Sequence, residues 1–411
     1  MSFGLSEHLV AWGFGVFLAA LWVSRLAVVA LNLDKVTDIT SPEYDSIPQD
    51  ASGNAPRVSI VVPARNEAEH IRAALLSLLE LDYPDYEVVV IDDRSDDATG
   101  TILDQLQNEW RDRGEELHHR LKVIHLHELP PGWLGKPHAM WHGAKQATGE
   151  WILFTDADIV FGADALRRTM NYAVRERADH VVLFPTMAMH SLGERMMIGF
   201  FQSQFVFSHR PWKVSDPKSR DAIGVGAFNL IQRDVYEQIG TYRRLRLEVV
   251  DDMRLGEVVK ESGFRQRVVF GRNLLRLRWF IGAHGMVRNL TKNGFAILRF
   301  NVGLTGLAVS SLLVVNVGPF VGTVLATGLA KTGFVVALTG VVAIYVGMSR
   351  HSDVPPYYFL LHPVGAFLFG YAIVRSAFLT LWHDGIDWRG THYPLAYLRQ
   401  FLREEPRRSW L

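Results

Sequence analysis

Long apolar segments stand at both ends of this chain of 411 residues, and they constrain its fold more than any other feature. A helix needs about 20 apolar residues to cross a bilayer. The first and second of the segments and the last one reach that length, whereas the third is marginal. The section between them has the texture of a water-soluble domain, so we predict a soluble domain fastened to a membrane on both sides. The apolar segments cover residues 9–31, 302–327, 334–348 and 357–382.

The first apolar segment has two interpretations. A cleaved signal peptide is one, but the leading residues lack a basic start, and no small-residue cleavage site stands out. We therefore expect a retained transmembrane anchor over residues 1–33. The linker predicted over residues 34–56 is rich in Asp, Ser, Pro and Gly.

Composition excludes several classes of protein. Acidic and basic residues balance at 43 each, which argues against a nucleic-acid partner. The chain has no cysteine, so it has neither disulfides nor a thiolate metal site. Its 16 histidines show no zinc-binding spacing.

Strand patterns alternate with helix patterns from residue 57 to about residue 280. Such alternation predicts an α/β fold with a mostly parallel, Rossmann-like sheet and a site at the carboxyl ends of its strands. The predicted strands are 58–62, 86–91, 122–126 and 151–154, and the predicted helices are 66–80, 99–110, 136–148 and 253–261.

Acidic residues follow two of these predicted strands. Asp93 ends one of them, and Asp156 and Asp158 follow another. Neighbouring buried carboxylates are costly unless a positive group pairs with them. A divalent cation that carries a phosphorylated substrate is one such group. Turn chemistry at a strand end is the alternative.

Five short motifs stand in one order along the chain, at residues 61–67 (VVPARNE), 91–95 (IDDRS), 156–158 (DAD), 250–252 (VDD) and 278–279 (RW). This order resembles the membrane-bound, inverting family 2 glycosyltransferases with a GT-A fold. Residues 131–138 (PGWLGKPH) with Gly143 look most like the hopene-associated members, and ceramide and carotenoid glycosyltransferases are similar.

The resemblance implies a GT-A catalytic domain with amino- and carboxyl-terminal transmembrane helices. A helix that lies in the membrane surface would follow the catalytic domain, although an amphipathic core helix is the alternative. The expected limits are 57–280 for the catalytic domain, 281–300 for the interfacial helix, 301–383 for the transmembrane segments and 384–411 for a basic tail with Arg389, Arg399, Arg403, Arg407 and Arg408.

The resemblance also implies a donor site. Pro63, Ala64 and Glu67 would line the base and ribose of the nucleotide, and Asp93 would hydrogen-bond the base. From the residues themselves, a strand-to-helix turn offers backbone N–H groups to a phosphate. Glu67 has a second interpretation as a charge favoured at a helix start. Asp156 and Asp158 would hold Mg²⁺ or Mn²⁺ on the donor diphosphate.

The acidic pair before residue 253 is the candidate for proton transfer. By the family pattern Asp252 is the base and Asp251 supports it. A carboxylate within hydrogen-bond reach can take the proton of an attacking hydroxyl. Asp is also a preferred helix cap, and both roles are compatible.

The last motif departs from the family pattern. Arg278 can stabilise a leaving diphosphate, and Trp279 could floor the acceptor site. Related enzymes carry Gln or Arg where this chain has Leu275, which puts the acceptor contact in doubt and argues against a processive polymer synthase.

Three further features have open interpretations. Lys136 either reaches a phosphate or is an idle surface lysine. Gly226, in the segment 224–229 (GVGAFN), resembles the acceptor-side loop, where glycine lets the backbone approach the sugar. The Met- and Phe-rich segment 196–207 is either core packing or an apolar entrance for a lipid.

The expected function is transfer of a sugar from a nucleotide donor, a UDP-sugar being the first choice, to a hydroxyl of a membrane lipid such as a hopanoid. The alternatives are a polyprenyl-phosphate sugar synthase and an inactive nucleotide-sugar-binding subunit.

The expected location is the plasma (inner) membrane, with the catalytic domain in the cytoplasm. Four spans would leave the Arg-rich tail outside, whereas basic segments favour the inside. Either one apolar segment is re-entrant or interfacial, or the tail breaks the rule.

Overall fold

The computed structural model describes residues 5–49, 53–114 and 119–404, which form two compact units. The catalytic unit comprises Lys35–Ala188 and Pro211–Arg278, and the membrane unit comprises the chain up to Asp34, Met189–Arg210 and the chain from Trp279. Arg407 and Arg408 of the predicted basic tail lie outside the described residues. The domain limits given above stay predictions.

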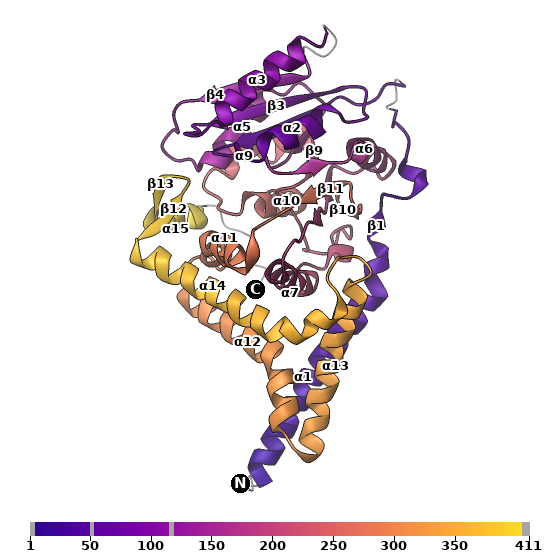
Figure 1. The fold of residues 1–411 in the computed structure, drawn as a ribbon, viewed down its shortest axis with the longest axis vertical. Coiled ribbons are helices and arrows are strands. Elements are labelled where there is room, and N and C mark those ends of the chain that lie inside the picture. Colours follow the sequence, from indigo (N-terminus) through magenta and orange to yellow (C-terminus); the bar gives the residue numbers. More distant parts are fainter. Residues whose placement is uncertain (1–4, 50–52, 115–118, 405–411) are drawn as a thin grey trace. The chain divides into compact units, whose positions relative to one another are not determined.

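An eight-stranded sheet organises the catalytic unit (Figure 1). Neighbouring strands are parallel except β9, which is antiparallel to both of its neighbours. The predicted mostly parallel α/β sheet is thereby confirmed. In spatial order the strands are β1 (Thr37–Asp38), β10 (Gln266–Phe270), β7 (His180–Leu183), β9 (Asn229–Gln232), β5 (Trp151–Phe154), β2 (Val58–Ala64), β3 (Tyr86–Asp93) and β4 (Leu121–Leu126).

Helices cover this sheet, and β2 and β3 are buried along their whole length. Strands covered on both faces are typical of parallel sheets, because crossover helices pack on them. One cluster joins α5 and α8–α10 to β2, β5 and β9. The helices are α2 (Ile71–Leu79), α3 (Thr99–Arg111), α5 (Gly135–Gln146), α6 (Ala165–Arg175), α8 (Arg233–Gln238), α9 (Thr241–Arg244) and α10 (Asp251–Glu261).

Helix α2, the first helix of the catalytic unit, begins five residues later than the helix predicted over residues 66–80. Asn66 has a φ of 55°, in the left-handed region, which ends any helical path there. The backbone N–H of Asn66 donates to Ser95 Oγ at 3.0 Å, and that of Glu67 donates to Thr99 Oγ1 at 2.8 Å. These bonds fold residues 66–70 into a turn, and α2 starts at Ile71.

A smaller three-stranded sheet belongs to the same unit, in the order β6 (Val160–Phe161), β11 (Leu275–Leu277) and β8 (Thr186–Met187). Leu275, which replaces a polar residue of the family pattern, is fully buried in β11. Its side chain therefore serves packing.

The membrane unit contains four helices that are long and apolar enough to cross a membrane. The segment that looked marginal reaches 21 residues, because its helix starts at Gly328. The elements of this unit are α1 (Leu5–Asn32), α7 (Leu192–His209), α11 (Gly282–Ile297), α12 (Val302–Leu325), α13 (Gly328–Met348), α14 (His362–Trp382), the hairpin β12 (Gly385–Trp388) and β13 (Thr391–Pro394), and α15 (Leu395–Glu404).

Helices α1 and α13 run parallel in close contact. A Cβ atom on Gly333 would lie 2.4 Å from the carbonyl carbon of Gly15, so only glycine allows this approach. Seven residues further along both helices, Gly340 meets Trp22. Helix α12 comes before α13 in the chain. A two-residue connection joins them, and the two helices run antiparallel. The carboxyl ends of α1 and α13 and the amino end of α12 therefore share one end of the unit.

Helix α14 begins and ends near that same end. At its start, His362 Nδ1 lies 3.2 Å from the hydroxyl of Tyr345, which is close to the carboxyl end of α13. Near its other end, Ser376 Oγ accepts the backbone N–H of Phe295, which shortly precedes α12. Figure 1 shows α14 running across α1 and α13 rather than along them. This course fits the alternative in which one apolar segment is re-entrant or interfacial, and the number of spans stays a prediction.

The tail hairpin and α15 also lie at this end. Arg399 donates to the carbonyl of Phe300, two residues before α12, at 2.8 Å. Lys292 of α11 lies over the ring of Trp388 at 5.5 Å. Helices α7 and α14 pack on α11, which has buried residues along its length. The predicted position of α11 in the membrane surface stays a prediction.

Helix α7 carries the Met- and Phe-rich segment. Met196, Met197, Ile198 and Phe200 are buried, which fits core packing. Gln204, one turn further, donates to Asn316 Oδ1 at 3.0 Å. The same oxygen lies 3.0 Å from His362 Nε2, and this shared contact ties α7 to α12 and α14. Buried polar groups among membrane helices are stable only with such partners.

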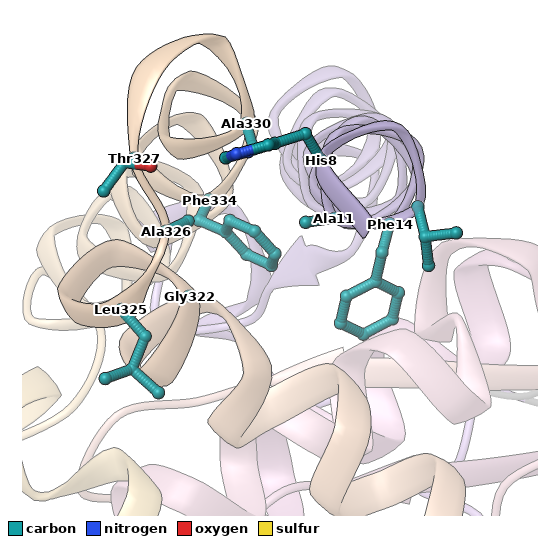
Figure 2. A pocket seen from close by; sticks show the side chains of 10 residues that line it. His8, Ala11, Phe14, Gly322, Leu325, Ala326, Thr327, Ala330 and Phe334 are labelled. Atoms are coloured by element: carbon teal, nitrogen blue, oxygen red, sulfur yellow. The ribbon is translucent and has the colours of Figure 1, made fainter. Parts of the chain in front are cut away.

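An apolar hollow of about 510 Å³ lies at the other end of the membrane unit. Figure 2 shows it between the amino-terminal part of α1 and the α12–α13 connection, with Phe14 and Phe334 in its wall. Apart from His8 and Thr327 its lining is aliphatic, aromatic or glycine, and it contains no carboxylate. Its lining offers one imidazole, that of His8, and no cluster of metal ligands.

The path of α14 predicts the side on which the tail lies. Because the chain has no native cysteine, single cysteines can be labelled without background from membranes of defined orientation. We expect Ile47→Cys in the linker and Arg403→Cys in α15 to react from the same side. Thr327→Cys, in the α12–α13 connection, should react only from the opposite side. Reaction of Arg403→Cys together with Thr327→Cys would instead show that α14 crosses the membrane.

Candidate active site

Three parallel neighbours in the sheet bring the predicted donor residues to one edge. Strand β2 ends at Ala64, β3 ends at Asp93, and β5 leads into Asp156. Pro63 and Ala64 are buried there. The carboxyl ends of parallel strands meet at one edge, so motifs far apart in the sequence become neighbours.

Asp93 is almost fully buried and paired. The guanidinium of Arg94 donates from Nε to Oδ1 at 2.8 Å and from Nη2 to Oδ2 at 3.0 Å. This two-point ion pair fixes the plane of the carboxylate. The amino end of α5 lies beside it, since a Cβ on Gly135 would meet Asp93 Oδ2 at 2.4 Å. Arg94 had not been singled out from the sequence, although it directly follows Asp93.

Lys136, in the first turn of α5, points into the acidic site. Its Nζ lies 2.6 Å from Asp156 Oδ1 and 3.8 Å from Asp251 Oδ1, and its side chain is 14% exposed. Burial alone would lower the pKa of Lys136, but the charges of Asp156, Asp251 and Asp252 together raise it. The ammonium group therefore stays charged among the carboxylates, which is not the position of an idle surface lysine.

Asp158, the second carboxylate of the Asp-Ala-Asp motif, lies in surroundings that disfavour its charge. Burial raises its pKa to about 6, and the nearby charges of Asp156 and Glu67 act in the same direction. Carboxylates that repel one another in this way favour a bound cation. Among the described residues no three possible ligands form a ready metal cluster. Two carboxylates nevertheless suit Mg²⁺, which usually takes one or two of them and completes its shell with phosphate oxygens and water.

Asp251 and Asp252 occupy the first turn of α10 and differ in surroundings. Asp251 is buried and accepts a hydrogen bond from the Tyr242 hydroxyl at 3.3 Å. Burial raises its pKa to about 7, although the charge of Lys136 opposes this shift. Asp252 is partly exposed, and burial of its carboxyl group raises its pKa as well. Of the pair, Asp252 is the one that an incoming hydroxyl can reach.

Gly226 connects the two acidic motifs. Its N–H donates to Asp252 Oδ2 at 2.7 Å, and its carbonyl accepts the N–H of Asp156 at 3.0 Å. A Cβ at this position would lie 2.3 Å from Asp156 Oδ2, so a side chain would displace that carboxylate. The other oxygen of Asp252 accepts the N–H of Met253 at 2.8 Å. Backbone N–H groups thus hold both oxygens of Asp252.

The last predicted motif is divided between the units. Arg278 is exposed and ends the catalytic unit after β11. Trp279 begins the next segment of the membrane unit, where its ring meets Phe201 edge-on at 4.8 Å. The roles given to Arg278 and Trp279 stay predictions. The contact from Tyr242 to Asp251 had no sequence signal, because it depends on how α9 packs beside α10.

The arrangement of the sheet corresponds to a GT-A fold. Among solved structures, the mannosyltransferase PcManGT from Pyrobaculum calidifontis, in complex with GDP-Man and Mn²⁺, has this fold, with a TM-score of 0.52 and 18% identity. The comparison covers 90% of this chain and 99% of that one.

Residues 59–240 match the family model described as glycosyl transferase family 2. The chain therefore contains a family 2 glycosyltransferase domain, and the family predicted from the motif order is confirmed.

Curated relatives agree with this class. The beta-monoglucosyldiacylglycerol synthase of Synechocystis sp. is 33% identical over 164 residues, which are 39% of this chain and 32% of that protein. The match thus spans about a third of that relative. The 4,4'-diaponeurosporenoate glycosyltransferase of Staphylococcus aureus is 21% identical over 391 residues, 91% of this chain and 99% of that one. The predicted enzyme class, a glycosyltransferase, is confirmed.

Proposed function

We propose that this enzyme transfers a sugar, with inversion, from a nucleotide-sugar donor to a hydroxyl group of a membrane lipid. A UDP-sugar is the proposed donor, and a hopanoid or similar isoprenoid-derived lipid is the proposed acceptor. The observation that carries the proposal is the link through Gly226, which bonds to the backbone N–H of Asp156, a proposed metal ligand, and to the carboxylate of Asp252, the proposed base. A donor diphosphate and an attacking hydroxyl would thus meet on one short loop.

The donor would lie along the carboxyl edge of the sheet. Pro63, Ala64, Glu67 and Asp93 are proposed to contact its base and ribose. The amino end of α5 directs backbone N–H groups and the positive end of the helix dipole to the same region, which suits a diphosphate. Lys136 can release Asp156 and turn its ammonium to a phosphate oxygen.

Asp156 and Asp158 are proposed to hold Mg²⁺ or Mn²⁺. When bound, the metal would neutralise charge that develops on the departing diphosphate. The presence of Mn²⁺ beside GDP-Man in the fold relative from P. calidifontis supports this choice. The mutual repulsion of the two carboxylates supports it as well.

Metal dependence can be tested by chelation and by mutation. Excess EDTA should abolish transfer, and added Mn²⁺ or Mg²⁺ should restore it. Asp158→Asn should remain folded but lose most activity even in saturating metal, because one carboxylate ligand is missing. Asp164→Asn serves as the control, because Asp164 follows β6 and pairs with Arg168 outside the site. Full activity in EDTA would exclude the metal role.

The chemical step needs a base on the acceptor side. Asp252 takes the hydroxyl proton while the acceptor oxygen bonds to the anomeric carbon. The bond from that carbon to the diphosphate oxygen breaks on the opposite face, and the configuration inverts. Arg278 is proposed to stabilise the departing diphosphate, and Trp279 is proposed to floor the acceptor site. Buried Asp251 would keep Asp252 and Lys136 in place.

Asp252→Asn tests the base. The amide keeps the size of the side chain but cannot take a proton, so kcat should fall by about two to four decades, which is the usual contribution of a general base. Nucleotide affinity, measured by calorimetry, should change little. Loss of nucleotide binding at unchanged folding would make Asp252 a donor-binding residue instead.

Two findings support a lipid acceptor. The chain carries four helices that are long and apolar enough to cross a membrane. The names of both curated relatives specify lipid-related molecules, a monoglucosyldiacylglycerol that the first one makes and a diaponeurosporenoate that the second one glycosylates. A polyprenyl phosphate fits less well, because Asp251 and Asp252 would repel an anionic acceptor. An inactive binding subunit would have no use for the intact set of carboxylates.

The acceptor can be identified directly. Purified enzyme in nanodiscs is given labelled UDP-sugars together with fractionated lipids, and products are analysed by mass spectrometry. We expect a glycosylated neutral lipid, with hopanoid alcohols as the first candidates and diacylglycerol as the comparison. The Asp252→Asn enzyme is the matched control. Label that appears only in soluble glycan, or only on polyprenyl phosphate, would reject the proposed acceptor.

We also propose that the catalytic unit lies on the cytoplasmic side of the plasma membrane, where nucleotide sugars are made. Lys35 follows the first span directly and supports this orientation. The contacts of α15 with the amino end of α12 support a tail on the same side.

A further inference from the structure

Three fully buried polar side chains lie behind the loop that carries Gly226. They are His180 on β7, Asn229 on β9 and Gln266 on β10, each at most 1% exposed. We propose that His180, acting through Asn229 and Gln266, positions this loop for sugar transfer and thereby sets the orientation of Asp252. The inference rests on the proposed function and adds a positioning residue to it.

The two amide side chains hold the loop backbone directly. Gln266 binds both backbone groups of Ile223. Its Oε1 accepts the N–H of Ile223 at 3.2 Å, and its Nε2 donates to the carbonyl of Ile223 at 2.8 Å. Asn229 Nδ2 donates to the carbonyl of Val225 at 2.8 Å. The backbone on both sides of Gly224 is thus fixed by side chains from two strands of the sheet.

The ring of His180 fixes both amides. Its Nε2 lies 3.1 Å from Asn229 Oδ1, and its Nδ1 lies 2.9 Å from Gln266 Nε2. The N–H of Ile223 requires Gln266 to present its oxygen to the loop, so Gln266 must donate to Nδ1 from its nitrogen. His180 then carries its proton on Nε2 and donates it to Asn229. This one neutral tautomer satisfies both contacts of the ring.

The surroundings of His180 favour this neutral form. Complete burial lowers its pKa to about 4, although the hydrogen bond to Asn229 opposes the shift. A second proton would place an N–H against the N–H of Gln266 and break the chain of bonds. The network is therefore a static support over the physiological pH range.

The loop connects the His180 network to the acidic residues of the site. Gly226 follows Val225 directly, and its N–H and carbonyl bond to Asp252 and Asp156. His180 touches neither carboxylate, so any effect on turnover must act through the loop. Without the ring, Asn229 Oδ1 would be buried without its partner, and the N–H of Gln266 that now points to the ring would keep only the longer contact to the carbonyl of Gly256 at 3.3 Å. Both amides would turn to improve their hydrogen bonds. Turning would move the backbone of residues 223–226.

Three variants test the proposal. His180→Phe keeps the ring volume but removes both hydrogen bonds, and His180→Gln keeps one donor and one acceptor. Val181→Ala is the matched control, because its buried side chain points to the opposite face of β7. Each is assayed for kcat, donor KM, nucleotide affinity and thermal unfolding.

We expect His180→Phe to lower kcat by about 10- to 100-fold, the size of effect that a small misplacement of a reacting group produces. Its donor KM should stay within about threefold, and His180→Gln should recover most of the turnover. Val181→Ala should unfold at a lower temperature yet keep the wild-type kcat. Unchanged kcat in folded His180→Phe would overturn the proposal, as would equal losses in His180→Gln and His180→Phe.

A folding failure and a failure of the proposed function give different results. If His180→Phe does not fold, His180→Asn replaces it, since this shorter amide cannot reach both partners, and wild-type turnover in that variant would overturn the positioning role. If the wild-type enzyme transfers no sugar to any lipid, the proposed function itself is wrong. Normal transfer by the wild type and by the folded His180 variants would reject only the inference.

Discussion

The arrangement of the candidate active site follows from one constraint, the mutual repulsion of carboxylates gathered at one edge of the sheet. Asp156, Asp158, Asp251 and Asp252 lie there together, and burial raises the pKa of Asp158, Asp251 and Asp252. The ammonium group of Lys136 lies among them. Because added positive charge would favour the ionised form of these carboxyl groups, the site has an electrostatic demand for cations. This demand makes the edge suitable for a metal-bound diphosphate, which brings its counter-charge with it.

Close backbone contact plays the corresponding role in the membrane unit. Between apolar helices in lipid, burial of apolar surface gives little driving force, and packing and buried hydrogen bonds decide the association. Gly15 against Gly333 supplies such packing, and the bonds between Gln204, Asn316 and His362 supply the polar part. In the membrane unit, a larger residue at Gly15 or Gly333 would prevent the close backbone contact, and an apolar residue at Gln204, Asn316 or His362 would remove a buried hydrogen bond.

Alternation of strands and helices was sufficient to predict the sheet, and strand ends were sufficient to predict that Asp93 and Asp156 lie at the same edge of it. Local patterns could not predict features that depend on three-dimensional direction. The length and hydropathy of residues 357–382 describe a span, but the sequence does not encode that α14 turns back, which follows from contacts such as Ser376 with Phe295. Likewise, nothing near His180 in the sequence indicates Gln266, because their contact arises only when β7 pairs with β10.

The course of α14 has a consequence for the fate of the product. On the topology that the labelling experiment tests, α1, α12 and α13 cross the bilayer and α14 returns to the side from which it starts. A lipid taken from the leaflet beside the catalytic unit would be released, with its new sugar, into that same leaflet. A sugar headgroup crosses a bilayer very slowly unaided, since its hydroxyls must lose their water. Synthesis would therefore make the two leaflets unequal in composition, and a separate lipid transporter would be needed to even them out.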